Sequence, residues 1–323
     1  MSYNGASSAR AQTESHHLQI SISMTADGSW SASRLDLRSM LGVEIRPSAS
    51  IDAQAASGLL RRAEEFFSLF SLQSFSFQQF LVHRGDHASG LAWQDGRDEQ
   101  DFHLPMAHQM LFEIPDQQSL ANALARWFDC TGDKSIAHWL FCEALSETSG
   151  GAARFMAIAQ AFEVYGRTLE LARPTSKEIL KLAVDRVKSC LAATGLPENY
   201  VERVANMIRS SNKASFQDVM QKLIRRATSG NLLVSDAEIT SFCQRVSKLR
   251  NDLVHVNGSD EAALSDAQFE ASIVGPKLTF WFAILAAQDL GLRPADMSIM
   301  MRNNRCARMG AVDDLTETTT RKS

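Results

Sequence analysis

The sequence has no excess of positive charge and no paired-cysteine pattern, and both absences exclude classes of protein. Its 323 residues include 33 lysines and arginines and 37 acidic residues, which give a net charge of −4. Proteins that hold nucleic acid with their whole surface are strongly basic, so any such contact must come from a local basic patch. The five cysteines form no C-x-x-C pair, which argues against a disulfide framework or a zinc site. A reducing compartment such as the cytoplasm fits better.

The sequence also lacks an apolar run long enough to span a bilayer. The most apolar run, LTFWFAILAA, covers residues 278–287, whereas a membrane helix needs ~20 residues. We therefore expect a buried core helix there and no membrane partner. The first residues, MSYNGASSARAQTESHH, contain no apolar segment of the kind found in signal peptides. We expect residues 1–16 to be a disordered tail and residues 293–323 to be a polar, frayed tail.

Between these tails the pattern of apolar and polar residues changes near residue 120, and this change predicts two domains. The first, residues 17–120, is expected to be a small α+β domain. It contains an alternating strand pattern at 18–24, a turn signal at Ala26-Asp27-Gly28, an amphipathic helix at 57–72 and another strand pattern at 75–83. The second, residues 121–292, has helical periodicity almost throughout. The predicted fold is mainly α, with a helical bundle after the α+β domain.

Eight helices are predicted after this change of pattern near residue 120. They cover residues 119–129, 135–145, 152–171, 176–193, 198–210, 215–228, 235–256 and 265–290. The helix at 235–256 is the most informative, because a capping box, Ser235-x-x-Glu238, opens it. Its apolar residues follow a 3-4-3-4-3 spacing and form a packing seam: Ile239, Phe242, Val246, Leu249, Leu253 and Val256. A polar stripe runs beside this seam: Gln244, Lys248, Asn251 and His255.

The string Arg250-Asn251-Asp252-Leu253-Val254-His255 resembles the R-x(4–6)-H motif of the HEPN superfamily of ribonucleases. Three further segments resemble the ApeA group, which are anti-phage HEPN proteins with an N-terminal α+β domain. They are EEFFSLFSLQSFSFQQFLVH (64–83), LARWFD (124–129) and FMAIAQAFEVYGR (155–167). Two other R-x(4–6)-H strings, Arg10 to His16 and Arg97 to His103, lie in the polar tail and in an acidic run. The helical surroundings favour the pair Arg250 and His255.

The chemistry of RNA cleavage suits these residue types. Without a metal, cleavage needs an acid and a base that work near neutral pH, which histidine provides. It also needs a fixed cation beside the phosphorane, which arginine provides. We therefore predict His255 as the general acid/base, Arg250 as the charge stabiliser and Asn251 as an orienting group. Lys248 and Arg245 are expected to contact RNA phosphates, and no metal or cofactor is expected.

The geometry of this pair is demanding, because residues five apart on a straight helix point ~140° apart. Arg250 and His255 can meet one phosphate through the reach of arginine, through a distorted last turn, or through a second subunit. The alternative interpretation is a solvated helix flank, with His255 favoured by the helix dipole and Asn251 a surface residue. Glu163 and Arg167, four apart, are spaced for a surface ion pair. Glu163 could instead support the predicted site.

Two classes of function follow. The first is an endoribonuclease that acts as a toxin-like effector in phage defence, and the resemblance implies that two protomers form a composite cleft. The expected partners are RNA, a second copy of the chain and a phage-derived trigger or regulator. The second class is a non-catalytic helical dimer that binds RNA or a regulatory partner.

Overall fold

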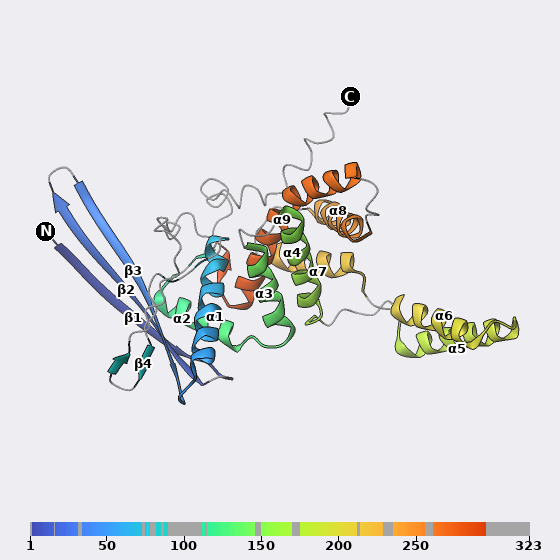
Figure 1. The fold of residues 1–323 in the computed structure, drawn as a ribbon, viewed down its shortest axis with the longest axis horizontal. Coiled ribbons are helices and arrows are strands. Elements are labelled where there is room, and N and C mark those ends of the chain that lie inside the picture. The colour runs from blue at the N-terminus through green and yellow to red at the C-terminus, as the bar shows by residue number, and fades with distance from the viewer. Residues whose placement is uncertain are drawn as a thin grey trace, which may run out of the picture.

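The computed structural model shows an N-terminal antiparallel sheet followed by an array of helices (Figure 1). The sheet has the order β1 (Ser2–Gln12), β2 (Leu18–Ser31), β3 (Arg34–Pro47). Two short strand pairs are β4 (Val82–Arg84) with β5 (His87–Ser89), and β6 (Phe112–Glu113) with β7 (Arg293–Pro294). The structure describes residues 2–15, 17–31, 34–72, 75, 77, 82–84, 87–89, 112–113, 115–145, 150–169, 175–211, 214–228, 235–255 and 261–294.

The helices confirm the predicted mainly α fold. They are α1 (Ala53–Ser71), α2 (Gln117–Asp129), α3 (Asp133–Leu145), α4 (Gly151–Gly166), α5 (Lys177–Ala193), α6 (Glu198–Ser211), α7 (Phe216–Thr228), α8 (Asp236–His255) and α9 (Glu261–Asp289). The helix predicted at 57–72 is α1, and each of the eight helices predicted after residue 119 is present with shifted ends. The strand predicted at 75–83 overlaps only the start of β4, and most of that segment lies outside the described residues.

The strand predicted at residues 18–24 is confirmed as the first part of β2. Leu18, Ile20 and Ile22 alternate along it and are buried, and α2 contacts both β1 and β2. The turn predicted at residues 26–28 is wrong, because β2 continues through it and pairs there with both β1 and β3. Backbone pairing on both sides outweighs the local turn preference of the Asp-Gly step.

The predicted disordered tail at residues 1–16 is also wrong, because most of it forms β1, paired along β2. The turn after β1 is closed by two hydrogen bonds. The N–H of Thr13 donates to the carbonyl of Leu18 at 2.9 Å, and the N–H of Leu18 donates to the Thr13 hydroxyl at 2.8 Å. The carboxylate of Asp129, at the end of α2, accepts two further backbone N–H groups of this turn at 2.9 Å. Tertiary contacts of this kind carry no signal in the composition of a Ser- and Ala-rich segment.

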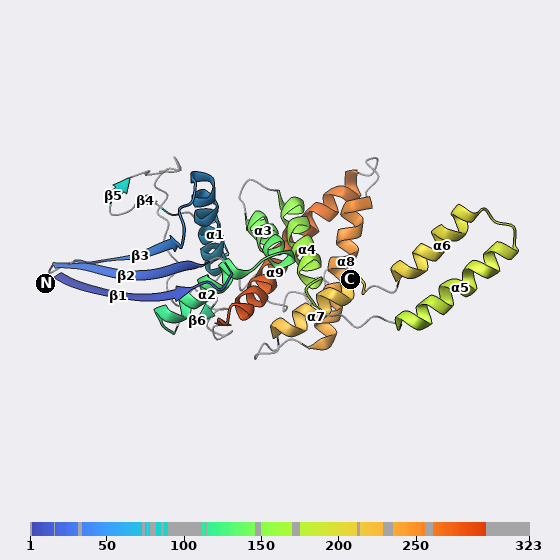
Figure 2. The same ribbon diagram turned by 90° about the horizontal axis from the view of Figure 1, so that it is seen from below.

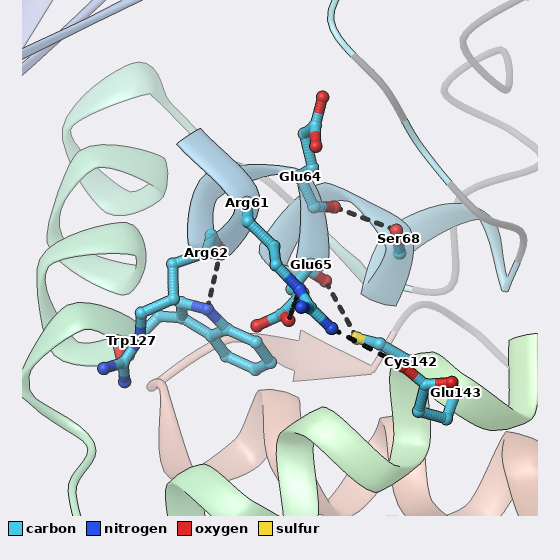
Figure 3. Close-up of polar contacts among 8 residues, drawn as sticks. All are labelled: Arg61, Arg62, Glu64, Glu65, Ser68, Trp127, Cys142 and Glu143. Atoms are coloured by element: carbon cyan, nitrogen blue, oxygen red, sulfur yellow. Dashed lines mark hydrogen bonds and ion pairs between the residues drawn. The ribbon is translucent and has the colours of Figure 1, made fainter. Parts of the chain in front are cut away.

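Helix α1 connects the sheet to the helical region (Figure 3). The indole N–H of Trp127 in α2 donates to the carbonyl of Arg62 at 2.9 Å, and the Arg62 guanidinium donates to the carbonyl of Trp127 at 2.8 Å. The thiol of Cys142 in α3 lies 3.8 Å from the carbonyl of Glu65, and its burial raises the thiol pKa. One continuous apolar core therefore joins both parts. The predicted boundary between residues 120 and 121 falls inside α2, and the division into domains stays a prediction.

Helix α9 forms the centre of the helical region, in contact with α3, α4, α7 and α8. It is long and apolar enough to cross a membrane by length and composition, but 72% of its most apolar window is buried inside the structure. This burial is typical of a core helix and agrees with the interpretation of residues 278–287. Gly291, with φ +81°, ends the helix as expected of a glycine in this position. The polar tail expected from residue 293 instead begins with β7, because Leu290 and Leu292 are buried and bring the chain back to β6.

Helices α5 and α6 form a hairpin that lies apart from the other helices in both views (Figures 1 and 2). The two helices pack against each other through Val184, Val201 and Ala205, which are buried. The hairpin is inserted between α4 and α7, and Leu169 before it and Ala214 after it still pack against the core of the bundle.

Candidate active site

Helix α8 carries the predicted site, and its start is determined by local sequence. The N–H of Glu238 donates to the Ser235 hydroxyl at 3.3 Å, and the N–H of Ser235 donates to the Glu238 carboxylate at 2.7 Å. The predicted capping box is therefore confirmed. The buried members of the predicted seam are Ile239, Phe242, Val246 and Leu249. Leu253 is partly buried, and Val256 lies outside the described residues. The seam holds α8 in the bundle and leaves its other side in solvent.

The predicted polar stripe lies on the solvent side of α8. Gln244, Lys248, Asn251 and His255 are all exposed. Asn251 and His255 share one face in the last turns of the helix, where a substrate could reach both. Arg245 is placed differently, because its guanidinium forms an ion pair with Glu270 of α9. An RNA phosphate would have to compete with Glu270 for this arginine.

Arg250 lies beside the seam, where α4, α7 and α8 meet. Its Nη2 donates to Oε2 of Glu163 in α4 at 2.7 Å, and the two side chains are 31% and 37% exposed. The other contact is with Phe216 of α7, whose ring centroid lies 4.9 Å from Cζ of Arg250. Two contacts from different helices therefore hold a cation that still reaches solvent. The ion pair that spacing suggested between Glu163 and Arg167 is absent among the described residues, since Glu163 pairs with Arg250.

Two local features bring α4 and α7 close enough to make these contacts. Gly166 ends α4 against Val219, and a Cβ at Gly166 would overlap the Val219 side chain. A glycine is therefore needed for this close approach. At the start of α7, the N–H of Asp218 donates to the Ser215 hydroxyl at 3.1 Å and the N–H of Ser215 donates to the Asp218 carboxylate at 3.0 Å. This predicted cap makes Phe216 the first residue of the helix.

Helix α8 remains α-helical through His255. A distorted last turn therefore does not bring His255 to Arg250, and among the described residues no hydrogen bond joins the two side chains. The reach of arginine and a second subunit remain as ways to combine them on one phosphate. In the part of the chain that the structure describes, no three His, Cys, Asp or Glu side chains gather as metal ligands would.

Residues 156–295 match the family model described as Apea-like HEPN. This part of the helical region is an Apea-like HEPN domain. The match begins inside α4 and ends just after β7, so the HEPN domain contains Glu163, Phe216 and Arg250 together with the exposed Asn251 and His255. The predicted resemblance is thereby confirmed, and the family favours a nuclease-type function in defence. No curated protein and no solved structure matches the chain.

Within the HEPN domain, Phe216 is a residue of the site that the sequence does not predict. The Ser215-x-x-Asp218 cap predicts that Phe216 begins a helix, but no pattern in the sequence predicts that its ring meets Arg250, which lies 34 positions later. An aromatic residue at the first position of a helix is partly exposed by default. Only the approach of α8 to the start of α7 gives it a cation to contact.

Proposed function

We propose that the protein is a metal-independent endoribonuclease of the HEPN type. The observation that carries this proposal is the setting of Arg250 inside the HEPN domain. Glu163 and Phe216 hold its guanidinium, while Asn251 and His255 are exposed nearby on the same helix. A partly exposed, fixed arginine beside an exposed histidine is the pair that phosphoryl chemistry on RNA requires.

In this mechanism the 2′-oxygen of a ribose attacks the adjacent phosphorus. His255 accepts the 2′-OH proton or donates a proton to the departing 5′-oxygen, and Arg250 stabilises the extra negative charge on the phosphorane. The P–O5′ bond breaks, which leaves a 2′,3′-cyclic phosphate and a 5′-hydroxyl. Asn251 orients the phosphate or the imidazole, and Lys248 and Arg245 add phosphate contacts. The need for a 2′-OH selects RNA over DNA.

One copy of the chain provides one His255 and one Arg250, ~140° apart around the helix. We propose that a homodimer brings two such pairs into one cleft, so that one histidine acts as base and the other as acid. Glu163 supports the site by fixing the direction of the Arg250 side chain. It also offsets the charge of Arg250 until a phosphate is present.

The biological role that follows from the family is a toxin-like effector of phage defence, active in the cytoplasm on cellular RNA. A phage-derived trigger or a regulator would control the cleavage. The N-terminal sheet and α1 would sense the trigger or restrain the HEPN domain, with which they share a continuous core.

Expression in a bacterium tests this function directly. Wild-type protein and His255→Ala are compared for growth inhibition and by sequencing of RNA ends. Wild type is expected to produce new 5′-hydroxyl ends that are absent with His255→Ala. Equal RNA ends in both cultures, with retained RNA binding, would favour the non-catalytic alternative.

A further inference from the structure

We propose that Phe216 is a positioning residue for Arg250, and that the ring of Phe216 holds the guanidinium in place during phosphate binding. This inference rests on the proposed function of the same site. Cζ of Arg250 lies 4.9 Å from the ring centroid of Phe216, which is inside the ~6 Å range of cation–π attraction.

The two contacts of Arg250 act on different parts of the guanidinium. Glu163 accepts a hydrogen bond from Nη2 and so fixes one edge. Cζ of Arg250 lies over the ring of Phe216, so this second contact holds the centre of the guanidinium. A guanidinium has five N–H groups in its plane, and two of them can grip a phosphate together. A ring beneath Cζ restricts the swing of the guanidinium, while N–H groups that Glu163 does not engage can reach the substrate.

Phe216 is itself held in place by α7. It is partly buried against the core, and the Ser215–Asp218 cap fixes the start of the helix just before it. One turn later Val219 lies against Gly166 of α4, so the backbone that carries the ring cannot move away without shifting the helix. The position of the ring is therefore set by the same packing that brings α4 and α7 together.

Loss of the ring's attraction would leave Arg250 with the edge contact to Glu163. The guanidinium could then rotate about this contact, and a smaller fraction of molecules would present the donors to the phosphorane. Because the negative charge of the phosphate grows in the transition state, the loss falls mainly on kcat and less on KM.

The test is a series of fluorinated phenylalanines inserted only at position 216 of the full chain, with one, two and three fluorines. Fluorine weakens the negative ring face and keeps the shape of the side chain, so folding is preserved. We expect kcat for an RNA oligonucleotide to fall stepwise, to about a fifth or less with three fluorines, as expected for the loss of a cation–π contact. The same series at Phe280, a core residue of α9 that is 1% exposed, should leave kcat unchanged.

Two substitutions support the series. Phe216→Tyr keeps a ring face and should retain most of the activity, whereas Phe216→Leu should lose as much as the trifluorinated protein. A flat fluorine series at position 216 in an active enzyme overturns this inference and leaves the proposed function intact. A wild-type protein that cleaves no RNA overturns the proposed function and this inference with it.

Discussion

His138 of α3 stacks face to face on Trp127 of α2, with ring centroids 4.1 Å apart and planes 6° apart. The imidazole is 3% exposed, and among the described residues neither of its nitrogens has a hydrogen-bond partner. Burial, and then the nearby cations Arg62 and Lys134, lower the pKa of His138 to about 3. The folded protein therefore keeps this histidine neutral at the junction of α1, α2 and α3.

The first prediction is a loss of stability in acid that depends on His138. In the unfolded chain the imidazole takes up a proton below pH ~6.5, whereas in the folded chain it does so only near pH 3. The unfolded state therefore binds more protons between these values. The stability that His138 contributes by staying neutral in the core is fully present above pH ~6.5. Below this pH, the free energy of unfolding should fall by up to ~1.4 kcal/mol per pH unit.

Urea unfolding of wild type and His138→Phe from pH 7.5 to 4.5 measures this effect. His138→Phe keeps an aromatic ring against Trp127 but has no titrating group, so its pH profile should be flatter than that of wild type. His17→Asn, which changes an exposed histidine, is the control and should keep the wild-type slope. Parallel profiles for wild type and His138→Phe would show that another group causes the acid sensitivity.

The second prediction concerns metals. Cleavage should persist in EDTA and should leave 2′,3′-cyclic phosphate and 5′-hydroxyl ends, because the proposed acid, base and charge stabiliser are all side chains. End labelling of a cleaved oligonucleotide identifies the products. Activity that disappears on chelation and returns with Mg²⁺ or Mn²⁺ would reject the mechanism.

The third prediction concerns the proposed catalytic pair. Arg250→Ala and His255→Ala should each lower kcat at least ~100-fold, since they remove the charge stabiliser and the acid/base group. Neither residue belongs to the buried seam, so the free energy of unfolding should change by about 1 kcal/mol or less. Lys181→Ala, on the separate α5–α6 hairpin, is a matched control for a lost surface charge and should cleave normally. Near-wild-type cleavage by either site variant removes that residue from the mechanism.

The sequence predicts those features of the site that depend on residues close to one another in the chain. The cap at Ser235 and the seam that includes Val246 and Leu249 lie within one helix, where spacing determines which residues face the core. The contact between Glu163 and Arg250 joins residues 87 positions apart, and only the packing of α4 against α8 creates it. Spacing alone predicts an ion pair between Glu163 and Arg167, because the i,i+4 rule considers only residues of the same helix.

The N-terminal strand was missed for a related reason. Residues 2–12 are mostly small or polar, a composition typical of disordered tails, and their stability comes from pairing with β2 and packing on α2. Polar contacts to this region come from Asp129 and Gln118 of α2, a helix that lies far along the sequence. Segments that are ordered by distant partners carry little evidence of that order in their own sequence.

The fourth prediction concerns the close approach of α4 and α7. Gly166→Ala should lower the free energy of unfolding by ~1–3 kcal/mol, because the added methyl overlaps the stiff side chain of Val219. It should also reduce cleavage, since this approach places both contacts of Arg250. Adding Val219→Ala should recover part of the stability of Gly166→Ala. Gly150→Ala is the control, because a Cβ there meets nothing within 4 Å.

The last prediction is that the active unit is a homodimer, with two pairs of Arg250 and His255 facing one cleft. In one chain the side chains of Arg250 and His255 point ~140° apart around the axis of a regular helix. Asn251 and His255 remain exposed beside the seam. Exposed apolar residues, Val254 at 56% and Phe269 at 69%, lie on α8 and α9 and suit a self-complementary interface. Pairing also doubles the positive charge at the cleft, which would help an acidic protein to hold RNA.

Sedimentation at micromolar concentration should give a dimer, and mixing identifies how the site is shared. When Arg250→Ala and His255→Ala chains are co-expressed, each heterodimer has one intact arginine and one intact histidine in its cleft. Purified heterodimers should therefore cleave RNA at a rate that differs from that of either parent homodimer and is lower than that of wild type, because one histidine must serve as both base and acid. If each chain worked alone, the mixture would be as inactive as its parents, because every chain would carry a defect. A monomer that cleaves at the full rate would contradict the shared cleft directly.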